Sequence, residues 1–191
     1  MGYKYDSEDQ IYVDYITRLG HVIDQYDKLN TNEKKFKVSL YLSVLQSILT
    51  YLNEANKRNP GMISHVFGLD SDITLMNDCW KENTYHDRSG THENKSKENF
   101  ITHLRNSLSH PSKTTEDDCE ETGFRQEEMS DYIHKIRFID TKTNINTKRK
   151  QKSVIELTVD QLFALVKNLI EGVSILNPSD NDTNSPMHNH R

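Results

Sequence analysis

The chain is poor in cysteine and in long apolar segments. It has 191 residues but only two cysteines, Cys79 and Cys119, which do not make the disulfide framework of a small secreted domain. No apolar run reaches the roughly eighteen residues that a transmembrane helix needs. No apolar stretch follows Lys4, so we expect no secretory signal. Together these absences predict a cytoplasmic protein with no membrane partner.

Positive charge is also scarce. The 24 Lys and Arg residues stand against 29 Asp and Glu residues, which gives a formal net charge of −5. A protein that holds nucleic acid mainly through its overall field would be basic. The charge balance therefore argues against tight nonspecific binding of RNA. It does not argue against a nuclease whose RNA contacts are local, brief or helped by a partner.

Several motifs that carry chemistry are missing. The chain has no glycine-rich phosphate loop, no nucleophile elbow and no HExxH sequence, which excludes nucleotide hydrolases, α/β-hydrolases and zincins. The expected polar loops contain four candidate zinc ligands: Cys79, His86, His92 and Cys119. Their spacing matches no compact zinc signature, so we expect unpaired loop cysteines, no metal and no cofactor.

Apolar periodicity predicts a mainly α protein, an up-and-down helical bundle. The long helices are expected over residues 8–29, 32–56, 97–109 and 159–176. The inward stripe of the first helix is expected to consist of Ile11, Tyr15, Leu19, Val22, Ile23 and Tyr26. The core-facing residues of the second helix are expected to be Phe36, Leu40, Val44, Leu45, Ile48, Leu49 and Leu52. A single domain is therefore predicted over residues 1–176.

The connections between these helices have their own patterns. Residues 132–139 and 154–158 have β-type composition on either side of a polar stretch, which predicts a β-hairpin (about 132–158) inserted before the last helix. A short helix or packed loop is expected within 60–69. Polar loops are expected over 81–96 and 112–128, and a disordered tail over 177–191.

Residues 100–111, FITHLRNSLSHP, carry the most informative pattern. Arg105 lies beside the apolar stripe of its helix, so its guanidinium can reach the rim of the bundle. Asn106 precedes His110 by four residues, the spacing at which helical side chains meet. His110 closes the helix, where the negative end of the helix dipole favours a protonated imidazole. This helix end is a candidate phosphate site.

Cleavage of RNA without a metal needs a base for the 2′-hydroxyl, an acid for the leaving 5′ oxygen and a cation for the charged transition state. His110 can serve as base or acid near neutral pH, and Arg105 can hold two phosphate oxygens. One Arg and one His are few groups for this reaction. A two-fold dimer that brings two such helix ends together would supply two of each.

The segment HLRNSLSHP resembles the R-x4-6-H motif of the HEPN superfamily, helical ribonucleases of toxin–antitoxin, abortive-infection and CRISPR-linked defence systems. The order of elements over residues 8–176 resembles plasmid- and defence-associated members. The resemblance implies a homodimer with a composite cleft, and metal-independent endoribonuclease activity that leaves a 2′,3′-cyclic phosphate. It assigns Arg105 and His110 as the catalytic pair and Asn106 as the polar residue beside the Arg.

The resemblance also implies an antitoxin or a defence-system partner protein. In HEPN toxins that are silenced by nucleotidyltransferase antitoxins, a Tyr two residues after the His accepts AMP. Ser112 stands at this position here. Control by tyrosine AMPylation is therefore not expected.

Five further residues are candidates for binding RNA. Ser109 adjoins the motif histidine, and Lys148, Arg149 and Lys150 form a basic run near the hairpin tip whose alternative is a solvated tip that keeps an edge strand soluble. His103 lies on the same helical stripe as the motif histidine, and a partly buried neighbour is its slightly favoured interpretation. The alternative function is a non-catalytic helical module that binds a partner protein or a nucleotide. The acidic balance and the shortage of further catalytic groups favour this alternative.

Overall fold

The computed structural model describes residues 8–29, 34–68, 70–85, 96–110, 122–129, 132–143 and 150–175. The helices of these segments are α1 (Glu8–Lys28), α2 (Lys34–Arg58), α3 (Met62–Val66), α4 (Asp70–Cys79), α5 (Lys97–Ser109) and α6 (Val159–Ser174). The strands are β1 (Trp80–Asn83), β2 (Gly123–Met129), β3 (Tyr132–Thr143) and β4 (Lys150–Thr158). The mainly helical class is therefore confirmed.

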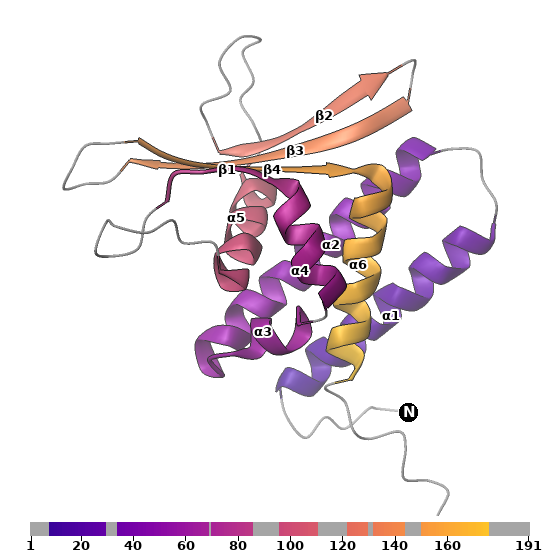
Figure 1. Cartoon of the computed structure of the whole chain (residues 1–191). Helices are drawn as coiled ribbons and strands as arrows, with labels where there is room; N and C mark the ends of the chain where they lie inside the picture. The colour runs from indigo at the N-terminus through magenta and orange to yellow at the C-terminus, as the bar shows by residue number, and fades with distance from the viewer. Residues whose placement is uncertain are drawn as a thin grey trace, which may run out of the picture.

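The helices pack together on one face of a small antiparallel sheet (Figure 1). The strand order is β1-β4-β3-β2. The expected hairpin is present, because β3 pairs with β4 from Lys135 opposite Thr158 to Thr143 opposite Lys150. Thr158 ends β4 and also begins α6, where it forms a capping box with Gln161. This junction turns the chain directly from the sheet into the last helix.

Three elements lie where the sequence led us to expect irregular structure. Strand β1 begins at Trp80, just before the expected loop 81–96, and β2 lies at the end of the expected loop 112–128. Helix α4 was not predicted either. Both strands pair along the outer edges of the hairpin, β1 on β4 and β2 on β3, so pairing with the hairpin strands overrides their weak local β preference. The two-stranded insert is thus a four-stranded sheet.

The inward face of α1 was predicted correctly at Leu19 and Ile23 but wrongly at three other positions. Ile11, Tyr15 and Val22 are 45%, 49% and 48% exposed, whereas Ile16 and Ile23 are fully buried. Helix α1 has apolar residues on two faces, and packing against α2 and α6 selects the face that carries Ile16 and Ile23. Phe36 at the start of α2 is also exposed, although the rest of the stripe predicted for α2 contributes to the core. An apolar surface therefore remains along α1.

Cys79 is buried at the end of α4 rather than placed in a polar loop. Burial raises the pKa of its thiol to about 11. Cys119 and the expected disordered tail 177–191 lie outside the described residues. None of the described helices is long and apolar enough to cross a membrane.

Helix α6 approaches α3 most closely at Gly172, where a Cβ atom would collide with the main-chain carbonyl oxygen of Val66. In an unobstructed helix Gly→Ala stabilises by about 1 kcal/mol. Here we expect Gly172→Ala to lower the melting temperature by several degrees, because overpacking costs about 1–3 kcal/mol and a backbone atom cannot yield as a side chain can. Thermal unfolding by circular dichroism measures the effect. The exposed neighbour Glu171→Ala is the control, and an unchanged or higher melting temperature for Gly172→Ala would contradict the packing described.

Candidate functional site

Helix α5 carries the Arg–His segment and has defined ends. Ser96 caps its first turn by accepting a hydrogen bond from the Asn99 main-chain nitrogen at 3.2 Å. At the other end His110 leaves the helix with an extended backbone, φ −116° and ψ 108°. Between the two ends the buried face of α5 packs against α2 and β3. The polar residues of the segment therefore sit on a helix fixed between another helix and the sheet.

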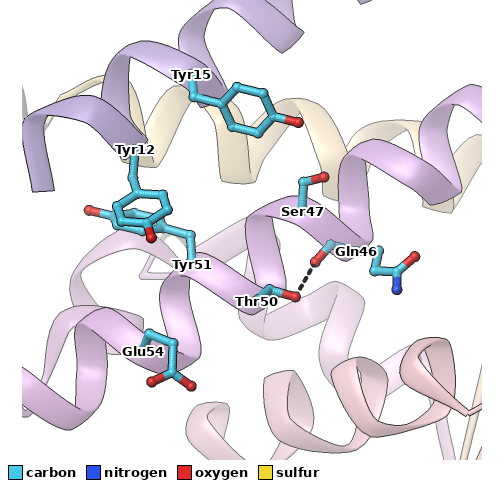
Figure 2. A pocket seen from close by; sticks show the side chains of 7 residues that line it. All are labelled: Tyr12, Tyr15, Gln46, Ser47, Thr50, Tyr51 and Glu54. Carbon is cyan, nitrogen blue, oxygen red and sulfur yellow. Dashed lines mark hydrogen bonds between the residues drawn. The ribbon is translucent and has the colours of Figure 1, made fainter. Parts of the chain in front are cut away.

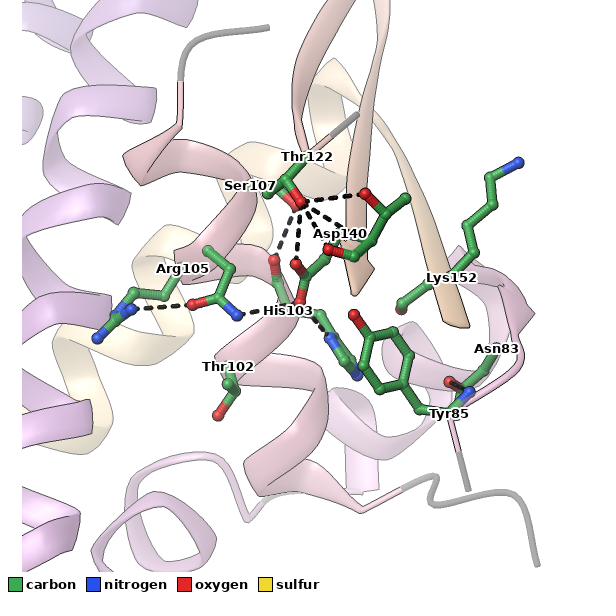
Figure 3. Close-up of polar contacts among 12 residues, drawn as sticks. Asn83, Tyr85, Thr102, His103, Arg105, Ser107, Thr122, Asp140 and Lys152 are labelled. Carbon is green, nitrogen blue, oxygen red and sulfur yellow. Dashed lines mark hydrogen bonds and ion pairs between the residues drawn. The ribbon is translucent and has the colours of Figure 1, made fainter. Parts of the chain in front are cut away.

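The carboxylate of Asp140 on β3 lies at the centre of the polar network (Figure 3). Its Oδ2 atom is 2.7 Å from His103 Nδ1 and accepts a hydrogen bond from Asn106 Nδ2 at 3.0 Å. Its Oδ1 atom accepts from Thr122 Oγ1 at 3.3 Å, just before β2. Only 7% of the Asp140 side chain and 6% of the His103 side chain are exposed. A buried carboxylate thus ties α5 to two neighbouring strands.

Arg105 is connected to this network through Asn106. The Arg105 Nη1 atom donates to Asn106 Oδ1 at 2.9 Å, while the amide nitrogen of the same Asn106 side chain donates to Asp140. Figure 3 shows the Arg105 side chain on the opposite side of the cluster from Tyr85. Asn106 therefore fixes the half-buried guanidinium of Arg105 relative to the buried carboxylate of Asp140.

The charge of Arg105 also acts on α2, the helix beside α5. The pKa of Glu54 lies below its usual value, first because Lys57 Nζ donates to its carboxylate at 2.7 Å and also because of the positive charge on Arg105. The carboxylate of Glu54 is therefore within electrostatic range of Arg105.

The far side of His103 faces Tyr85. Their ring centroids are 4.4 Å apart, and neither His103 Nε2 nor the Tyr85 hydroxyl has a hydrogen-bond partner among the described residues. Burial, and then the charge of Asp140, raise the pKa of Tyr85 above its ordinary value. The Tyr85 hydroxyl is therefore protonated throughout the physiological range.

The structure brings three of the predicted site residues together: Arg105, Asn106 and His103. His110 and Ser109 are exposed at the end of α5, and no hydrogen bond or ion pair between described residues joins His110 to Arg105. The binding of RNA by the buried His103 stays a prediction.

Of the predicted basic run, the structure describes Lys150 alone. Lys150 is exposed at the first position of β4, where it pairs with Thr143. Lys148 and Arg149 lie outside the described residues. The role of this run in binding RNA stays a prediction.

Asp140, Thr122 and Tyr85 were not predicted from the sequence. Asp140 could have been found from the sequence. Ile136, Phe138 and Asp140 occupy every second position of a strand and so share one face, on which Ile136 and Phe138 are buried. An acidic residue on the core-facing side of an apolar strand predicts a buried carboxylate that needs a hydrogen-bond partner. Thr122 and Tyr85 carry no comparable signal, since each lies at the border of a polar segment.

The geometry defines a class of protein: a helical domain whose Arg–Asn–x3–His helix packs on a small antiparallel sheet. Comparison with protein families gives the particular assignment. The family model described as HEPN pEK499 p136 matches residues 1–177, so the chain belongs to this family. Neither a curated protein nor a solved structure shows significant similarity to the chain.

Removal of the central carboxylate tests the network. We expect Asp140→Ala to lower the free energy of unfolding by about 1–3 kcal/mol for each buried group left without a partner, since His103 and Asn106 lose their common acceptor. Guanidinium denaturation measures this loss. The exposed Asp78→Ala on α4 is the matched control, and equal stability of the Asp140 and Asp78 variants would show that the carboxylate does not hold α5.

Proposed function

We propose that this protein is a metal-independent endoribonuclease of the HEPN type, with its helices in the up-and-down arrangement of that class. It acts in the cytoplasm as a toxin or an anti-phage defence effector. The observation that carries this proposal is the Asp140–Asn106–Arg105 chain of hydrogen bonds, which positions a guanidinium on the helix whose end exposes His110. Membership of the HEPN family supports the same conclusion.

Each motif residue has a defined role in the proposed reaction. Arg105 binds the non-bridging phosphate oxygens and stabilises the negative charge of the transition state. His110 takes the proton from the 2′-hydroxyl or gives one to the 5′ oxygen. The 2′ oxygen then bonds to phosphorus as the bond to the 5′ oxygen breaks, which leaves a 2′,3′-cyclic phosphate and a 5′-hydroxyl. Asn106 orients Arg105.

Further RNA contacts are proposed at the end of the helix and at the hairpin. Ser109 lies next to His110, and Lys150 is exposed at the start of β4. His103, Lys148 and Arg149 complete the proposed set. An antitoxin or a defence-system protein is the proposed regulatory partner.

A homodimer would complete the site. The reaction needs a base and an acid, whereas one chain offers a single motif histidine that is exposed, His110. A two-fold axis beside the α5 ends would bring a second His110 and a second Arg105 to the same phosphate.

The second candidate function is a non-catalytic helical module that binds a partner protein or a nucleotide. Two observations favour it: the net charge of −5 and the absence of a described contact between His110 and Arg105. The variants below separate this candidate from the nuclease.

Cleavage of tRNA and total RNA in the presence of EDTA tests the nuclease. We expect the purified protein to cut, and Arg105→Ala and His110→Ala each to lower the rate at least about a hundredfold. This is the usual contribution of one group that stabilises transition-state charge, and of one general acid or base. His134→Ala, which changes an exposed histidine on β3, should cut normally. Equal activity of the His110 and His134 variants, or a requirement for added Mg²⁺, would contradict the proposal.

The dimer is tested independently of activity. Analytical ultracentrifugation should give a mass twice that of the 22.3 kDa chain. The cleavage rate should rise more steeply than linearly with protein concentration near the dissociation constant of the dimer. A monomer that cuts at a rate proportional to its concentration would exclude the composite site.

A further inference from the structure

A groove opens between α1 and α2, on the exposed apolar surface of α1 (Figure 2). Its volume is about 360 Å³, and its lining is formed by Tyr12, Tyr15, Gln46, Ser47, Thr50, Tyr51 and Glu54. Tyr12 and Tyr15 are 45% and 49% exposed. Three of the nine tyrosines of the chain therefore gather at one groove, two of them with rings open to solvent.

Packing fixes the ring of Tyr12 at the groove. Tyr12 stacks on Tyr51 with ring centroids 5.3 Å apart and an interplanar angle of 25°, and Tyr51 itself is buried. Tyr15 projects from α1 three residues further on, about 4.5 Å along the helix axis. Both rings line the same groove, so bases of one unpaired strand can each stack on a ring.

Several lining residues of the groove lie on α2, the helix against which the Arg105-bearing helix α5 packs. Glu54, which lines the groove, lies three residues beyond Tyr51 on α2, and its carboxylate is hydrogen-bonded to Lys57 and acted on by the Arg105 charge. The acid at this end of the groove is thus balanced by two cations. A phosphate bound at Arg105 would meet little repulsion from Glu54.

We propose that this groove is a stacking subsite for single-stranded RNA, in which consecutive bases lie on Tyr12 and Tyr15 while the phosphate beside them reaches Arg105. The assignment rests on the proposed nuclease function, because it takes RNA as the substrate. Stacking on aromatic rings suits an acidic protein, since it binds every base through its π face without a basic field. The groove binds unpaired strands and not duplex, whose bases are already stacked.

Binding of a fluorescent 2′-O-methyl oligouridine, followed by anisotropy, tests the subsite. This probe lacks the 2′-hydroxyl and cannot be cut, so binding is measured apart from cleavage. We expect Tyr12→Leu and Tyr15→Leu each to weaken binding at least about fivefold, the lower end of the effect of losing one stacked base. Tyr12→Phe and Tyr15→Phe keep the ring and should bind nearly as tightly as the original chain.

Val22→Ala provides the matched control, because Val22 is 48% exposed on the same helix and does not line the groove. Val22→Ala should bind normally. The proposal is overturned if the Leu variants bind as tightly as the original chain, or if the original chain does not bind the probe. It is also overturned if the Leu variants lose the sedimentation mass of a dimer, since the groove would then hold a second copy.

The results separate the subsite from the nuclease. Tyrosine-dependent binding without any RNA cleavage would keep the subsite and reject the nuclease. The opposite result is cleavage in EDTA that depends on His110, together with probe binding that does not change in the Tyr12 and Tyr15 variants. This result would support the nuclease and reject the subsite.

Discussion

The contact between the Asp140 carboxylate and helix α5 is the interaction on which the candidate site depends. A carboxylate with so little exposure is costly to bury unless its oxygens are hydrogen-bonded. His103, Asn106 and Thr122 supply these bonds, and two of the three donors come from the motif helix. The same contact that stabilises the buried charge therefore fixes the rotation of α5 against the sheet and the direction of Arg105.

The sheet gives this contact its rigidity. Strand β3 lies between β4 and β2, so Asp140 projects from an interior strand rather than from a loose edge. The other end of the molecule is organised differently, since α1 buries one apolar face against α2 and α6 and leaves a second face with tyrosines open. Glu54 connects the two regions, since it lines the groove and its carboxyl pKa is lowered by Lys57 and also by the charge of Arg105.

Local pattern was enough to predict the long helices, the hairpin and the bounds of α5, because apolar periodicity and the Ser96 cap act within a few residues. It was not enough for β1, whose partner β4 is distant in sequence, or for β2, whose polar sequence has little β preference although its partner β3 follows directly. On α1 it was correct only in part, because two apolar faces compete and packing selects one of them. Arg105 and Asn106 were found from the motif, whereas Asp140 needed the fold to place it beside them.

The central claim is that a guanidinium and an imidazole of this chain cut RNA by attack of the 2′-hydroxyl. Mass spectrometry of the ends of fragments produced in EDTA tests this most directly. The account predicts 2′,3′-cyclic phosphates and 5′-hydroxyls from the original chain, and no such fragments from His110→Ala. Fragments that end in a 5′-phosphate, or intact RNA after long incubation with the dimer, would contradict it.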